Sequence, residues 1–200
     1  KKQKKILILG IAAGSVVETL VKEIAFDGEI HGVPYNVIQG NLLMTSYEII
    51  FDSIHWKDNK GMHVVTGAIG LKNEKKLNLQ INSSNIRIEN ILKAGNLPYE
   101  VTGWVDNDMT ITGTIDMPII DGDIVARNGS VMGELFQSFS THYIYKNGQL
   151  SLNNGMGNIY DSNILLHGNI SSDALDLEVN LTNVDVRRIL QKDSVDGKVT

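Results

Sequence analysis

The chain has 200 residues, of which 42% are hydrophobic and 20% are charged, as expected for a folded protein rather than a disordered one. Its formal net charge of -5 gives no electrostatic reason to expect a nucleic acid partner, because such partners are bound mainly through basic surface. The absence of cysteine excludes disulfide bonds and thiolate metal sites.

The amino-terminal stretch allows two interpretations. Lysines in residues 1–5, followed by apolar residues 6–17, have the order of charge and apolar length found at the start of a signal peptide. The same residues 6–9 also fit a β-strand of a longer chain, and we favour the strand because a sequence repeat runs through it. Spacing of apolar residues in 15–24 predicts a short helix. No apolar stretch reaches the roughly 18 residues that a membrane-spanning helix needs.

Most of the remaining chain alternates between apolar and polar residues, which predicts β-strands. The clearest case is residues 109–117, where Met and Ile alternate with Thr and Asp. Two Asn-Gly pairs, at 128–129 and 147–148, predict tight hairpin turns, because both residues of such a turn need positive φ. The apolar spacing at Ile88, Ile91 and Leu92 predicts a short helical segment.

A repeated unit is the most informative feature of the sequence. Residues 77–92 align without gaps on residues 175–190, with Asn85 on Asn183, and the start of the chain fits the same pattern more loosely. Each unit consists of an alternating strand that breaks at an Asn and continues into a short apolar turn or helix. Irregular spacing between the units excludes a strict solenoid and favours a growing sheet with variable hairpins. Residues 1–200 are therefore expected to be a single β-repeat segment of a longer chain, with units that begin near residues 6, 77 and 175.

The apolar residues of these strands are expected to share one face of an antiparallel sheet. The candidates are Leu77, Leu79, Ile81, Met109, Ile111, Ile115, Leu150, Leu152, Leu175, Leu177 and Val179. An apolar face normally needs a second layer to cover it, and this chain has little helix to supply one. Either a second sheet closes an ordinary dry core, or the face stays open as a groove that acyl chains can occupy.

The sequence pattern resembles the TamB/AsmA family of bacterial envelope proteins. The similarity lies in the strand 175–179 followed by 183–190, and in 111–115 leading through Pro118 to 122–124 and 128–129. The resemblance implies a mainly β fold, an elongated antiparallel sheet curled into a groove (a β-taco), with a few short helical turns. This chain departs from the family pattern because it has no clear membrane anchor and no finished carboxyl end.

The resemblance also implies a function and a location. Members of this family cross the periplasm from an inner-membrane anchor, and they are linked to phospholipid transfer between membranes or to outer-membrane protein assembly. For this chain we expect phospholipid acyl chains as partners and, through the parent chain, a barrel protein of the outer membrane. We expect no nucleic acid, cofactor, metal or catalytic residue, and we infer membrane attachment for the parent chain only.

Two other classes of protein remain as alternatives. The first is a structural or adhesive scaffold, whose sheets close into a dry core and whose polar face binds a protein partner. The second is a carbohydrate hydrolase that would use acids between residues 106 and 123, although we expect these acids to lie in solvated loops. The acids are Asp106, Asp108, Asp116, Asp121 and Asp123. No phosphate loop, zincin helix or nucleophile elbow is found, and His55 and His63 are expected to be ordinary strand or surface residues.

Overall fold

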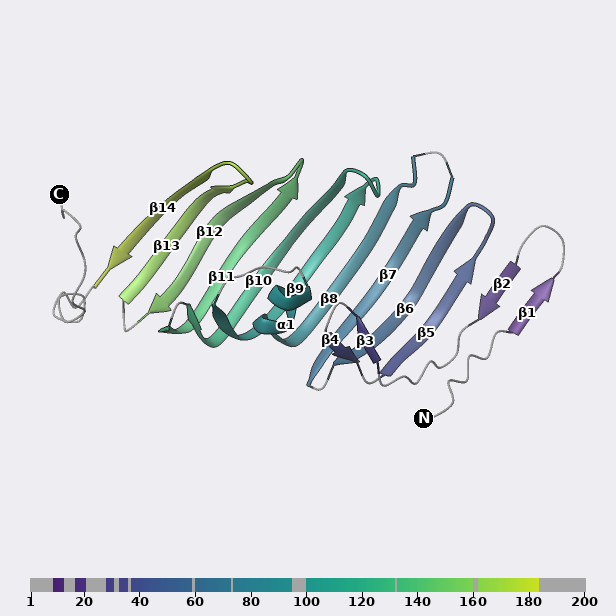
Figure 1. The fold of residues 1–200 in the computed structure, drawn as a ribbon, viewed down its shortest axis with the longest axis horizontal. Helices are drawn as coiled ribbons and strands as arrows, with labels where there is room; N and C mark the ends of the chain where they lie inside the picture. The colour runs from purple at the N-terminus through teal and green to yellow at the C-terminus, as the bar shows by residue number, and fades with distance from the viewer. Residues whose placement is uncertain are drawn as a thin grey trace.

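The computed structural model describes residues 9–12, 17–20, 28–30, 33–35, 37–58, 60–72, 74–94, 100–131, 133–159 and 162–183. Its main element is one antiparallel sheet of ten strands, in which each strand pairs with the next along the chain (Figure 1). The strands are β5 (Val37–Met44), β6 (Glu48–Asp58), β7 (Gly61–Gly70), β8 (Leu77–Arg87), β9 (Val101–Gly113), β10 (Pro118–Val131), β11 (Glu134–Lys146), β12 (Gln149–Ile159), β13 (Ser162–Ile170) and β14 (Leu175–Thr182).

Three smaller elements accompany this sheet. Strands β1 (Leu9–Ala12) and β2 (Val17–Leu20) form one hairpin, and β3 (Gly28–Ile30) and β4 (Val33–Tyr35) form another. The short helix α1 (Ile88–Ala94) follows directly after β8. The predicted helix at Ile88, Ile91 and Leu92 is therefore confirmed.

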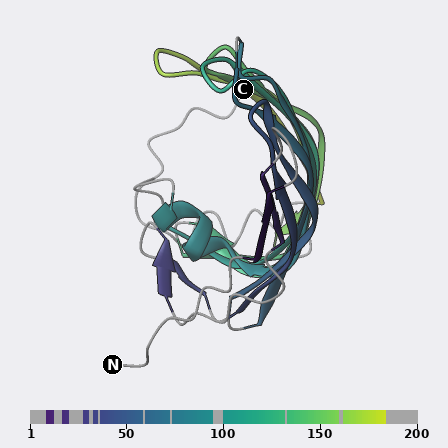
Figure 2. The ribbon, with the colours of Figure 1, turned by 90° about the vertical axis from the view of Figure 1, so that its right-hand side faces the viewer.

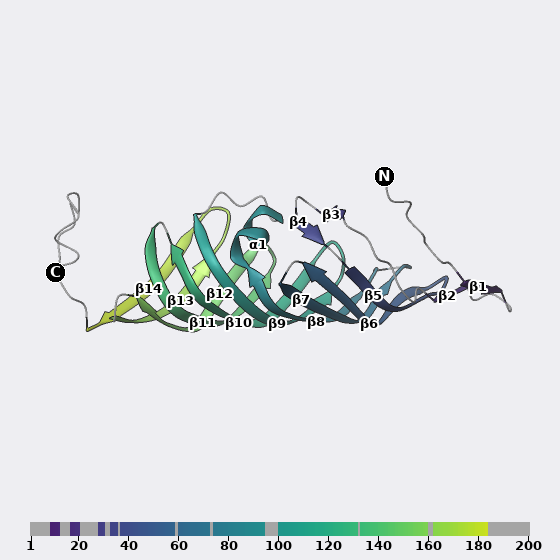
Figure 3. The same ribbon diagram turned by 90° about the horizontal axis from the view of Figure 1, so that it is seen from below.

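The large sheet is long and strongly curved. Its strands stack side by side along the length of the molecule (Figure 3), and the sheet forms an arc when it is viewed along that length (Figure 2). Among the described strands β5 and β14 are the outer ones of this sheet, so it does not close on itself. The predicted fold, an elongated antiparallel sheet curled into a groove with little helix, is confirmed.

Bulges contribute to the bending of the sheet, and four strands carry one that lies at a residue with positive φ. Each of β6, β8, β10 and β12 carries one residue more than a neighbouring strand at a register shift. A non-glycine residue with positive φ lies at each shift: Ser53 (64°), Asn85 (56°), Asn128 (48°) and Asn154 (54°). An extra residue of this kind bends its strand and increases the local twist. Asn suits the position because its short side chain tolerates the left-handed conformation better than most.

The two Asn-Gly pairs have different outcomes. Asn147 and Gly148 join β11 to β12 with φ of 53° and 77°, so the hairpin predicted there is confirmed. The hairpin predicted at Asn128 and Gly129 is wrong, because both residues lie inside β10 and form its bulge. A Cβ at Gly129 would lie 2.0 Å from the carbonyl oxygen of Thr102, so glycine is required by the close approach of a neighbouring strand.

The repeat unit has a structural counterpart in two strands. Its second and third copies begin with β8 and β14, and the aligned Asn85 and Asn183 both have positive φ, at 56° and 61°. In β8 the strand has a bulge at Asn85, continues to Arg87 and is followed directly by α1, so the predicted break is a bulge instead. Residues 184–190 and residues 6–8 lie outside the described residues. The helix predicted over 15–24 is wrong at Val17–Leu20, which forms β2 against β1, and its other residues lie outside the described ones.

Candidate functional site

The register of the sheet places apolar side chains in rows that cross the strands. Residues paired across neighbouring strands point to the same face, so a chain of pairs defines a row. The first row crosses all ten strands and contains a single glycine among apolar and aromatic residues. From β5 to β14 it runs through Leu42, Phe51, Gly67, Leu79, Ile111, Ile120, Tyr145, Leu150, Ile170 and Leu175.

A second row lies on the same face, two residues from the first along each strand except β6, where the bulge at Ser53 makes the step three residues. From β6 to β14 it runs through Ile54, Val65, Ile81, Met109, Gly122, Tyr143, Leu152, Gly168 and Leu177. We call the two rows together the apolar band. The band is extended on the other side of the first row by Met44, Ile49, Ile69 and Leu77, which pair with one another in the same way.

The candidates predicted from sequence fall in or beside this band, with one exception. Eight are members of the two rows, while Leu77 and Val179 lie two residues from a member and so face the same side. Ile115 differs, because β9 ends at Gly113 and the chain turns over Thr114 and Met117. Gly113 has φ of 82°, which ends the alternation, and Ile115 is 48% exposed in the turn. The prediction that the strand continues to Met117 is therefore wrong.

Several members of the band could not be assigned to it from the sequence. Phe51 lies in a continuous apolar run with Ile49 and Ile50, so period two could not assign a face to it. Tyr143 and Tyr145 flank Ile144, which points to the opposite, polar face of the sheet. Only the partners on neighbouring strands show to which face each of these side chains points. Those partners depend on the positions of the bulges.

Helix α1 identifies the face that carries the band as the concave one. Ile88 in α1 packs on a cluster of four buried residues, and the register places three of them, Ile86, Val105 and Ala126, on the same face as the two rows. In Figure 2 the helix lies on the inner side of the arc. The buried cluster consists of Ile86, Val105, Ala126 and Phe136. The apolar band therefore lines the inside of the curled sheet.

The band itself is only partly shielded from solvent. Among the described residues, the buried cluster under α1 contains every apolar residue classed as buried. The members of the two rows are mostly half-buried, and Leu175 at the outer strand is 70% exposed. The β3–β4 hairpin also lies on the side of α1, where β4 contacts β6 and α1 (Figure 3). Neither described element extends across all ten strands of the band.

A more polar row lies between the band and the buried cluster. From β7 to β11, His63, Ser83, Asn107, Ile124 and Thr141 follow one another across the sheet, so this row is polar except at Ile124. The His63 Nδ1 lies 2.9 Å from the Ser83 Oγ. The Tyr143 hydroxyl donates to Asn107 Oδ1 at 3.0 Å. Half-burial raises the pKa of Tyr143, so this phenol stays protonated and keeps its donor at neutral pH. The concave face thus has an apolar band with a polar boundary on the side of α1.

The acidic residues lie on the opposite, outer face. The expectation that they occupy loops is wrong for Asp106 and Asp108 in β9 and for Asp121 and Asp123 in β10, whereas Asp116 does lie in a turn. Their side chains alternate with the band residues and so point outward. His142 lies 3.2 Å from Asp123 and 3.6 Å from Asp121.

One carboxylate of this group helps to hold a bulge. The backbone N–H of Asn85 donates to Asp106 Oδ1 at 2.8 Å, and Arg127 binds the other carboxylate oxygen at 2.6 Å. Partial burial alone would raise the pKa of Asp106, but these two hydrogen bonds outweigh it and hold the pKa below its ordinary value. Asp106 is therefore ionised at neutral pH and fixes the chain where β8 leads into α1.

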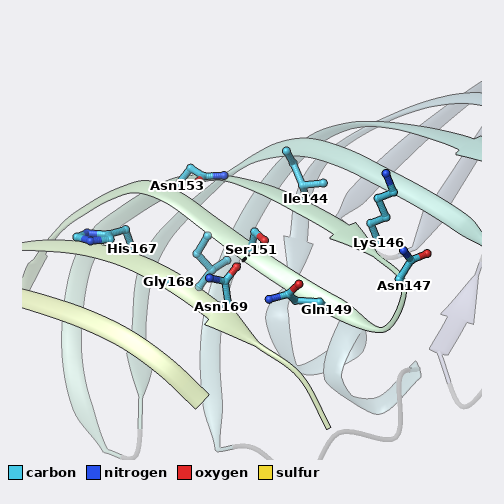
Figure 4. Close-up of a pocket in the computed structure, with 10 residues that line it drawn as sticks. Ile144, Lys146, Asn147, Gln149, Ser151, Asn153, His167, Gly168 and Asn169 are labelled. Carbon is cyan, nitrogen blue, oxygen red and sulfur yellow. Dashed lines mark hydrogen bonds between the residues drawn. The ribbon is translucent and has the colours of Figure 1, made fainter. Parts of the chain in front are cut away.

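The outer face also contains a shallow polar hollow over β11 to β13 (Figure 4). Its volume is about 560 Å³, and amide and hydroxyl groups dominate its lining, including Gln149, Asn153 and Asn169. The Ser151 hydroxyl donates to Asn169 Oδ1 at 2.7 Å within it. This hollow is lined mainly by polar groups, so it lacks the continuous apolar surface that the band has.

The described residues show no other candidate site with clear chemistry. Within them no three His, Asp or Glu side chains are grouped to hold a metal ion, and His55 and His63 point to opposite faces of the sheet. The described part of the chain also has no helix with the length and apolar character required to cross a membrane.

Comparison with models of protein families, with curated proteins and with solved structures finds no significant match for this chain.

Proposed function

We propose that this chain is a segment of an envelope protein of the TamB/AsmA type, and that its apolar band guides phospholipid acyl chains between two membranes. The observation that carries the proposal is the first row, which continues across ten strands on the concave face. The parent protein would be anchored in the inner membrane and would lie in the periplasm. Assistance to outer-membrane protein assembly, which the family resemblance also suggests, would use the same face.

The chemistry of the band suits an acyl chain. Each methylene that leaves water gains about 0.8 kcal/mol, so an exposed apolar surface of this length attracts lipid tails. Its residues are aliphatic or aromatic without a charged side chain in either row. Because the rows run perpendicular to the strands, a bound tail can pass from strand to strand along the molecule without meeting a charge.

Guidance of this kind requires no covalent step. A surface of even apolar character binds a tail at many equivalent positions, so the tail does not meet a deep energy minimum that would retain it. The half-buried state of the band supports an open groove over a closed scaffold core, in which these side chains would be fully buried.

The test compares neighbouring residues of β14 that point to opposite faces. Leu177 belongs to the second row, and Glu178 points outward toward His167 at 3.2 Å. We expect Leu177→Asp to reduce the phospholipid that co-purifies with the protein several-fold, because a charge in the groove must give up its hydration when a tail binds. Glu178→Lys should leave the bound lipid unchanged. Mass spectrometry of extracted lipid measures both, at equal strand content by circular dichroism.

Two results would contradict the proposal. Equal loss of lipid in both variants would show that the effect does not depend on the face of the sheet. Absence of phospholipid from the unmodified protein, prepared with its parent chain from a bacterial envelope, would favour the closed scaffold that binds a protein partner.

A further inference from the structure

One long edge of the sheet carries a second exposed apolar surface, made of loops. Three hairpin connections follow one another at the upper edge of the sheet in Figure 1. Their described residues are 45–47 between β5 and β6, 71–72 and 74–76 between β7 and β8, and 114–117 between β9 and β10. We call these three loops the apolar rim.

Hydrogen bonds join the loops into one surface. The backbone N–H of Leu71 donates to the carbonyl oxygen of Tyr47 at 2.7 Å, and that of Ile115 donates to the carbonyl oxygen of Lys75 at 3.2 Å. Each loop is thus fixed to the next one along the edge. Since strands in a sheet are about 4.8 Å apart, successive hairpins on one edge follow each other at regular steps.

Large apolar side chains project from all three loops. Tyr47 and Met117 are each 66% exposed, and Ile115 and Leu71 also have exposed side chains. Isolated exposed apolar residues are common, but several on adjoining loops usually mark a contact surface. The connections further along the same edge differ, because residues 147–148 and 171–174 are polar or small.

Charged residues in the rim have mixed signs. Lys72, Lys75 and Lys76 lie beside Glu74 and Asp116, and Lys76 pairs with Glu74 at 3.4 Å. The ammonium group of Lys72 lies 4.2 Å from the centre of the Tyr47 ring. An amphipathic ring beside a long basic side chain is typical of residues at a membrane interface, where the ring lies at headgroup level and the ammonium group stays in water.

We propose that the apolar rim docks on the surface of a lipid bilayer. Exposed apolar side chains on three loops that are hydrogen-bonded to one another suit an extended partner such as a bilayer surface. The mixed charges make apolar insertion the main driving force. The rim also adjoins the edge of the apolar band at Met44 and Ile69, where β5 and β7 reach their loops. Because the three loops follow one another along the length of the sheet, docking would lay the groove alongside one bilayer. The docking proposal rests on the loops alone and does not rest on lipid transfer between two membranes.

The absence of cysteine makes single-site labelling straightforward. Tyr47→Cys and Met117→Cys each receive an environment-sensitive fluorophore, and phosphatidylcholine vesicles are then added to the full chain. We expect the emission at both positions to shift to shorter wavelength, as a dye does when it leaves water. Two matched controls are Leu135→Cys, which is 63% exposed at the start of β11 on the opposite edge, and Ser172→Cys on the polar part of the same edge.

A second measurement needs no label. The double variant Tyr47→Ser, Met117→Ser should lower affinity for the same vesicles about tenfold, the size expected for the loss of partly buried apolar side chains. Leu135→Ser should leave the affinity unchanged. Unchanged emission at 47 and 117 would overturn the proposal and would leave a protein partner as the occupant of the rim. Equal shifts at all four labelled positions would also overturn it. Failure of lipid to co-purify would not affect these read-outs.

Discussion

The covered and the uncovered parts of the concave face have the same sequence pattern and a different degree of burial. Beneath α1, Val105 is 0% exposed, and its neighbours Ile86 and Phe136 are also buried. Along the apolar band, equivalent residues of the same strands, such as Leu79 and Ile111, are only half-buried. Alternation places side chains on a face, but a dry core forms only where the chain supplies a second layer.

The largest expected effect lies beneath the helix. Ile86→Ala should lower the free energy of unfolding by about 3 kcal/mol, because it leaves a cavity among closely packed neighbours. Ile111→Ala in the band should cost about 1 kcal/mol, since that side chain is already partly in water. Urea denaturation measures both. Equal costs would show that the band is as well covered as the cluster and would remove the basis for an open groove.

The bulge at Asn85, which leads into α1, should contribute less to the stability of the fold than the buried cluster does. Asn85 has φ of 56°, and its side-chain amide donates to the carbonyl oxygen of Lys60 at 3.1 Å. Asn85→Ala should lower the free energy of unfolding by about 1–2 kcal/mol, through the left-handed backbone and the lost hydrogen bond. Asn85→Gly should recover part of this loss, because glycine adopts the conformation freely. No recovery would contradict the backbone explanation.

The smallest expected effect on stability concerns Asp106 and depends on pH. The folded state lowers the pKa of Asp106, so its contribution to stability is present above the pKa of the unfolded chain, about 4, and is lost as the pH falls through the lower folded value. Asp106→Asn should therefore cost up to about 1 kcal/mol at pH 7, a modest amount because the side chain is partly exposed.

Denaturation curves at several pH values would check this assignment. The difference between Asp106→Asn and the unmodified protein should shrink as the pH falls below about 4, while Asp173→Asn on an exposed connection should show little difference at any pH. A difference for Asp106→Asn that grows in acid would contradict the assignment.

The sequence was sufficient to predict most of the strands of the large sheet, their antiparallel order and most of the band. Period-two alternation indicated the face of Leu79, Ile111 and Leu177 without knowledge of their neighbours. The repeat also pointed to the special role of Asn85 and Asn183, which share positive φ.

What could not be predicted depends on contacts between strands. Asn128 and Gly129 have the composition of a hairpin turn, and only the approach of Thr102 and Phe136 to Gly129 shows that they form a bulge instead. The four acids Asp106, Asp108, Asp121 and Asp123 resembled loop residues in the sequence. Their pairing with neighbouring strands, and the face to which they point, cannot be read from the sequence of a single strand. At these positions the pairing between strands decides the structure, although the local sequence favours a turn or loop.

Photo-crosslinking in cells tests the central claim most directly. A photoreactive amino acid replaces residue 79 or 177 on the concave face, or residue 78 or 178 on the outer face, and mass spectrometry identifies what becomes attached. An open groove for acyl chains predicts phospholipid at 79 and 177 and none at 78 and 178. Protein adducts, or no adducts, at 79 and 177 would mean that the band is covered and would contradict the account.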